Sequence, residues 1–157
     1  MILQIDDWQF QIFEVTQRKY YARERAEHCT CAWCRNYYMA VDMQYPNLRP
    51  LMERFSVQID APCEMLAFHP TLCNAYFAVS GKILKRGEAP IMVDGLTVEP
   101  MERDESMVNF QEDWPVFFLY VSCMTLPWVL EESMNEADSP AKGQKFIQRL
   151  LSRWITE

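Results

Sequence analysis

The sequence contains few of the residues on which several common functional sites depend. Its 157 residues include only four glycines, which argues against a glycine-rich phosphate-binding loop. They also include only two histidines. The longest apolar stretch, residues 116–124, is far shorter than the roughly 20 residues that span a bilayer. The first ten residues lack the basic and apolar segments of a secretory signal. We therefore expect a cytoplasmic protein that has reduced thiols and does not contact a membrane.

Positive charge is scarcer than negative charge, so that the chain has a net charge of −7. Nucleic-acid phosphates and anionic lipids would repel such a chain, so we expect neither as a partner. Only residues 140–157 are basic, with four basic side chains against one acidic side chain. Acidic side chains are concentrated in residues 99–113 and 131–138. This distribution favours a basic protein partner, of the kind that acidic inhibitors or immunity proteins bind.

Half of the residues are apolar, which is enough for one hydrophobic core, and we expect a single domain over residues 1–157. Polar and charged residues that favour helices predict a short exposed helix over residues 16–27, with Thr16 as its cap. Apolar residues at helical spacing predict helices over residues 31–43 and 47–55, which form a helical hairpin. Ser139 and Pro140 predict the start of a final helix that extends to about residue 155.

Strands are predicted between these helices. Asp94 and Gly95 separate two short apolar runs, which is typical of a two-residue hairpin turn, and Gly81 suggests a bulge or bend within its strand. The fold class is therefore α+β, mainly an antiparallel sheet with an early helical hairpin and a C-terminal packing helix. The predicted strands cover residues 8–15, 64–69, 73–84, 91–93, 96–98, 107–111 and 116–124.

Residues 29–38, CTCAWCRNYY, place three cysteines at the predicted start of a helix, where Thr30 is expected to be the N-cap. One interpretation is that one thiol of the CxxC pair packs inward and the other is half-exposed. A second is that Cys31 and Cys34 form a redox pair, since a helix N-terminus lowers a thiol pKa. A thioredoxin-like pair, however, lies between a strand and a helix, and here a helix precedes it.

A third interpretation is a structural zinc site, which requires four ligands in a tetrahedron. One knuckle supplies three cysteines, and a more distant C-x5-H-x3-C segment offers the remaining ligands, although it does not repeat the CxxC spacing. The candidate zinc ligands are Cys29, Cys31, Cys34, Cys63, His69 and Cys73.

No catalytic arrangement is evident, and the sequence favours a protein that is not an enzyme. Cys73 and His69 are close enough in sequence for a dyad, but no third residue is placed to orient the histidine. Structural roles are expected for Trp33, Glu64 and Asn36. We predict that the Asn36 amide hydrogen-bonds to backbone of residues 57–64, because a polar side chain early in a helix needs a partner.

Several segments resemble those of an uncharacterised family of short bacterial proteins. These are the CTCAWCRNYY segment at residues 29–38, the Pro-x-Glu-Met step at 62–65, an aromatic strand that ends at Gly81, and PWVLEE at 127–132. The resemblance implies no activity. The leading hypothesis is a non-catalytic binding protein with a basic protein partner. The alternatives are a structural zinc domain and a thiol-redox protein.

Overall fold

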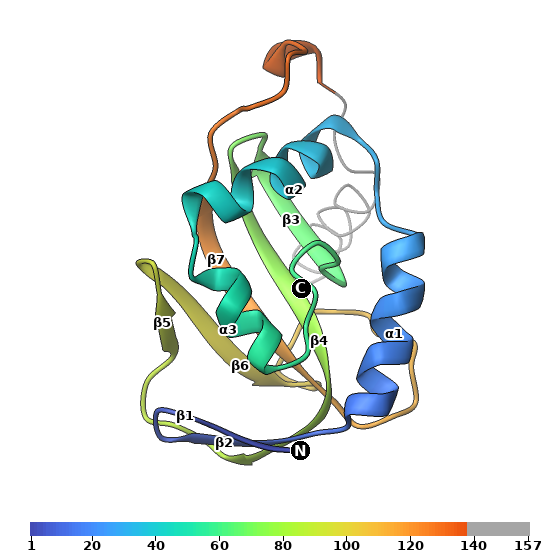
Figure 1. The fold of residues 1–157 in the computed structure, drawn as a ribbon, viewed down its shortest axis with the longest axis vertical. Coiled ribbons are helices and arrows are strands. Elements are labelled where there is room, and N and C mark those ends of the chain that lie inside the picture. The colour runs from blue at the N-terminus through green and yellow to red at the C-terminus, as the bar shows by residue number, and fades with distance from the viewer. Residues whose placement is uncertain (138–157) are drawn as a thin grey trace, which may run out of the picture.

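The computed structural model describes residues 1–137, which form a seven-stranded antiparallel sheet with three α-helices (Figure 1). The strand order is β1-β2-β4-β7-β6-β5, and β3 pairs with β4 beside this path. This confirms the α+β class, whereas the predicted helix over 139–155 lies outside the described residues. The elements are β1 (Ile2–Ile5), β2 (Trp8–Ile12), α1 (Glu14–Ala26), α2 (Ala32–Gln44), α3 (Leu48–Arg54), β3 (Glu64–His69), β4 (Leu72–Lys85), β5 (Ile91–Val93), β6 (Leu96–Glu102), β7 (Val116–Thr125) and a 3-10 turn, Met134–Glu136.

The centre of the sheet is β7, which lies between β4 and β6. Phe117, Phe118 and Leu119 are consecutive in β7, and all three are fully buried. Because consecutive strand residues point to opposite faces, both faces of β7 are covered. The continuous apolar run in the sequence predicted such a central strand.

In the described part of the chain, no helix is long and apolar enough to cross a lipid bilayer.

Helix α1 lies beside β4 and covers a gap along the edge of that strand (Figure 1). On this edge, β3 pairs with β4 as far as Tyr76, and β2 pairs with it from Gly81 onward. The buried Gln17 side chain bridges the gap, since its Nε2 donates to Ala78 O (3.2 Å) and its Oε1 accepts from Ser80 N (2.6 Å). Side chains of α1 thus replace the missing strand partner, which satisfies buried backbone groups.

Helices α2 and α3 cover one face of the sheet (Figure 1). At the end of α3, the Phe55 ring packs edge-on against Phe10 of β2, with centroids 5.0 Å apart. Phe10 in turn stacks on Phe117 of β7 at 5.2 Å. On α2, the buried Tyr37 hydroxyl donates to Ile59 O (2.8 Å), which attaches this helix to the loop before β3. Apolar packing and a few buried hydrogen bonds therefore position α2.

One predicted turn is confirmed and one predicted strand is wrong. Asp94 and Gly95 both have positive φ, 49° and 78°, as a type I′ hairpin turn requires. Residues 107–111, predicted as a strand, have no regular structure. Arg103 donates to the carbonyls of Phe110 (2.6 Å) and Glu112 (3.0 Å), so an arginine side chain binds carbonyls of this segment instead of a neighbouring strand.

Candidate metal centre

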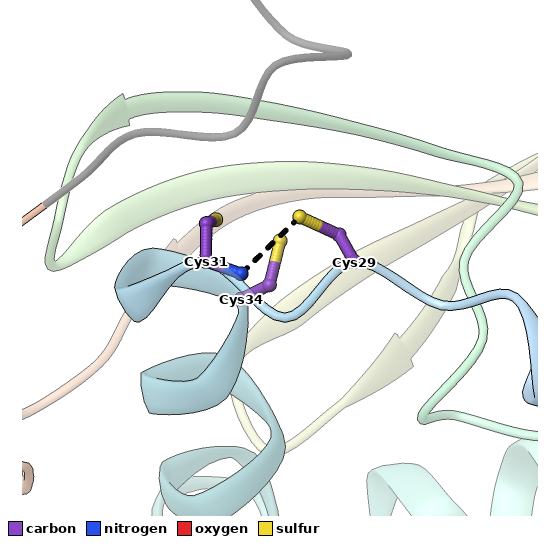
Figure 2. A group of neighbouring side chains, drawn as sticks. All are labelled: Cys29, Cys31 and Cys34. Atoms are coloured by element: carbon purple, nitrogen blue, oxygen red, sulfur yellow. Dashed lines mark hydrogen bonds between the residues drawn. The ribbon is translucent and has the colours of Figure 1, made fainter.

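Three cysteines meet where the loop after α1 enters α2 (Figure 2). Cys29 lies in the loop, Cys31 is the N-cap residue of α2, and Cys34 lies in the first turn. Their Sγ atoms all lie within 4.8 Å of one another. Thr30 was predicted as the cap, but the helix begins one residue later, and Cys31 caps it without a side-chain hydrogen bond.

The three thiols differ in exposure. Cys34 is only 3% exposed, whereas Cys29 and Cys31 are half-buried. This confirms the prediction that one thiol of the CxxC pair packs inward and the other stays partly accessible. Burial raises the pKa of both Cys31 and Cys34, and neighbouring thiol groups raise that of Cys34 further. Without a cation beside them, these thiols are therefore protonated at neutral pH.

Hydrogen bonds hold the cysteine loop in place. The Cys31 backbone N–H donates to Cys29 Sγ at 3.5 Å (Figure 2). The Tyr38 hydroxyl donates to Cys29 O (3.0 Å), and the Arg35 guanidinium donates to Thr30 O (3.0 Å). The sequence prediction missed Tyr38. Tyr38 could have been identified from its spacing, because it lies four residues after Cys34 and the two side chains therefore share one face of the helix.

The cluster has the dimensions of a thiolate metal site. Three sulfurs bound tetrahedrally to one zinc ion, each at about 2.3 Å, lie about 3.8 Å from one another. The observed limit of 4.8 Å therefore leaves an adjustment of at most about 1 Å. Rotation of half-buried side chains can supply this adjustment. The three cysteines can thus hold a metal ion such as zinc.

The other predicted zinc ligands do not join this cluster in residues 1–137. Cys73 is buried in β4, opposite Ala67 of β3. His69 is exposed at the end of β3, where its Nδ1 lies 2.9 Å from the Thr71 hydroxyl. Cys63 lies just before β3 and lines a cavity of about 40 Å³ together with Cys29 and Cys34. Only Cys63 among the distant candidates therefore lies near the knuckle.

Asn36 is fully buried and bridges α2 to the segment after β7. Its Nδ2 donates to Pro127 O (3.0 Å), and its Oδ1 accepts from Val129 N (2.8 Å). The prediction of a backbone partner is confirmed, but its location in residues 57–64 is wrong. Arg35 forms an ion pair with Glu132 (2.7 Å) nearby. Two segments almost a hundred residues apart in sequence thus meet beside the cysteines.

Replacing Asn36 by leucine is expected to lower the free energy of unfolding by about 2–4 kcal/mol, because two backbone groups lose their partner. Exchange of the Val129 amide with solvent is expected to accelerate as well. Urea unfolding and hydrogen exchange measure the two effects, and the same change at the exposed Asn135 is the control. Equal stability of the two variants, with unchanged exchange at Val129, would show that the bridge is unimportant.

The remaining predicted structural residues flank the centre. Trp33 is half-buried on α2, and its Nε1 atom is covered without a hydrogen-bond partner in the described part of the chain. Glu64 is half-buried at the start of β3, opposite Tyr76, and it lines the same cavity as Cys63. The structural roles expected for both residues stay predictions.

No protein-family model, curated protein or solved structure matches this chain. Its function is therefore inferred from the arrangement of its own residues.

Proposed function

We propose that this protein binds one zinc ion through the thiolates of Cys29, Cys31 and Cys34, and that the ion has a structural role. The observation that carries the proposal is the convergence of three Sγ atoms within 4.8 Å at the start of one helix. Thiolate ligands select thiophilic ions such as zinc. Three of the four ligands of a structural zinc site would come from one short segment.

The surroundings of the cluster support a structural role. The loop that carries the cysteines joins α1 to α2. Helix α2 is in turn attached to the segment after β7 through Asn36 and Arg35. An ion on this loop would fix the direction of α2 relative to the rest of the fold. Its binding free energy would then add to the stability of the folded chain.

The electrostatics favour a ligand role over a redox role for the CxxC pair. A nucleophilic redox thiol has a lowered pKa, which keeps it ionised at neutral pH. Burial acts in the opposite direction on both Cys31 and Cys34 and raises their pKa. A divalent cation offsets this effect, because it stabilises the thiolate that binds it. Metal binding therefore explains better than thiol catalysis why three buried or half-buried thiols lie close together.

The test is a titration of the reduced, metal-free chain with Co²⁺, followed by absorption spectroscopy. We expect thiolate-to-cobalt charge-transfer absorption that saturates at one ion per chain and is displaced by Zn²⁺. A folded, reduced chain that shows no such absorption would overturn the proposal. The exposed Cys123 provides the control, since its replacement by serine is expected to leave the spectrum unchanged.

A further inference from the structure

The three-cysteine cluster leaves one position of a zinc tetrahedron to be filled. We propose that Cys63 is the fourth ligand, so that the site is a closed four-thiolate centre that joins the start of α2 to the start of β3. This inference rests on the proposed zinc-binding function. It adds the missing ligand and predicts that the ion has no position open to a substrate.

The first support is the cavity that separates Cys63 from the knuckle. Cys29 and Cys34 line one part of it, and Cys63 lines another. Its volume of about 40 Å³ is larger than the roughly 10–15 Å³ that a single water molecule requires, so the cavity has room for an ion. Cysteines from two segments of the chain, Cys29 and Cys34 of the knuckle and Cys63, therefore line one cavity that has room for a metal ion.

The second support is the position of Cys63 in the chain. It lies in the loop between α3 and β3, one residue before the strand begins at Glu64. A loop residue can change its side-chain rotamer without breaking a strand pair. Cys73, in contrast, is buried within β4 between two paired strands and is not among the residues that line this cavity.

The third support is the hydrogen bonding of Cys63. Its thiol donates to Tyr76 O at 3.2 Å, and its own backbone N–H donates to the same oxygen at 2.8 Å. Loss of the thiol proton on metal binding therefore leaves the Tyr76 carbonyl satisfied. The side chain can turn into the cavity without creating an unsatisfied buried acceptor, which would be destabilising.

The cavity is also lined by His28 and by three carboxylates (Glu24, Glu27 and Glu64), but these groups fit the fourth position less well. The His28 side chain is exposed, and its ring lies against Tyr38 with centroids 4.8 Å apart. Glu64 is paired opposite Tyr76 in the β3–β4 ladder, so its backbone is fixed by the sheet. A thiolate also matches the other three ligands in softness, which a carboxylate does not.

Zinc-edge X-ray absorption of the zinc-loaded wild-type chain tests the ligand set without any substitution. We expect four sulfur neighbours at about 2.3 Å. Three sulfurs with one nitrogen or oxygen would overturn the assignment of Cys63 and leave the proposed zinc binding intact. A chain that binds no zinc at all would overturn both, so the two failures are distinguishable.

A pair of variants provides the second readout. Replacing Cys63 by serine is expected to weaken zinc binding by about 100-fold or more, since changes outside the ligand shell already cost about 10–100-fold. The same change at the exposed Cys123 is expected to leave zinc affinity unaltered. Competition with a chromogenic chelator measures both affinities. A Cys63→Ser chain that retains the wild-type affinity contradicts the proposal.

Discussion

A chain in which Cys34 is replaced by serine is expected to bind zinc at least about 100-fold more weakly than the wild type. The change removes one thiolate from the knuckle and leaves a hydroxyl group, which is a much poorer ligand for zinc. Cys34 is the most buried of the three clustered cysteines, and it lies in the first turn of a helix. Only two sulfurs of the three-cysteine cluster are then left to bind the ion.

The same substitution is expected to remove the stabilising effect of zinc. Free zinc at 100 times its dissociation constant adds about 2.7 kcal/mol to the free energy of unfolding of a chain that binds it only when folded. Urea unfolding with and without zinc measures this difference. Wild-type protein is expected to gain the full increment, and the Cys34→Ser variant is expected to gain at most about 0.4 kcal/mol at the same zinc concentration.

Two further variants keep this prediction testable even if a buried serine disturbs folding. Cys29 is only half-buried, so Cys29→Ser tests the knuckle with less disturbance of the core. Cys123→Ser changes an exposed thiol and serves as the matched control. If Cys34→Ser and Cys29→Ser both bind zinc as tightly as the wild type, the knuckle is not the site.

Replacing Gly81 by alanine is expected to lower the free energy of unfolding by about 3–5 kcal/mol, because a new methyl group collides with backbone. A Cβ atom at this position would lie 1.9 Å from Gln11 O and 3.2 Å from Ile12 Cα. These atoms belong to β2, which pairs with β4 at this residue. Neither strand can move without losing ladder hydrogen bonds, so the collision cannot be relieved cheaply.

Gly95 offers a control for this effect. It also has a positive φ, 78°, but a Cβ atom there would meet nothing within 4 Å. Gly95→Ala is therefore expected to cost only about 1–2 kcal/mol, from backbone strain alone. Denaturant unfolding compares the two variants directly. A Gly81→Ala chain that is no less stable than Gly95→Ala would show that β2 and β4 are not as close at this point as the structure indicates.

Much of the fold could be predicted because local pattern and tertiary environment agree. The Asp94-Gly95 turn is determined by two adjacent residues, and β7 by one continuous apolar run. The error at residues 107–111 has a tertiary cause. Val108 and Phe110 do alternate with exposed neighbours and pack against the core, but no strand of residues 1–137 pairs with this segment. Alternation of burial therefore does not suffice for a strand.

The candidate site could be predicted only in part. Cys29, Cys31 and Cys34 are close in sequence, so the start of one helix is enough to bring their sulfurs together. The location of Cys63 beside them depends on the packing of the loop before β3, which no local pattern encodes. The partner of Asn36 was missed for the same reason, since it lies more than ninety residues further along the chain.

The predicted basic protein partner stays a prediction. Several carboxylates in the acidic segments already have partners within the chain. Glu105 pairs with Arg86, and Glu112 pairs with Arg23. Exposed ion pairs of this kind each contribute about 0–1 kcal/mol, so a basic protein could still displace them. Binding that weakens as salt is raised would support such a partner, and capture of no basic protein from the native host would count against it.

The most direct test of the zinc-thiolate centre is the zinc content of the chain, purified under reducing conditions without chelators or added metal. Elemental analysis is expected to find about one zinc ion per chain. It is expected to find none when Cys29, Cys31 and Cys34 are all replaced by serine. A folded wild-type chain without zinc, or a triple variant that keeps it, would contradict the zinc-thiolate centre.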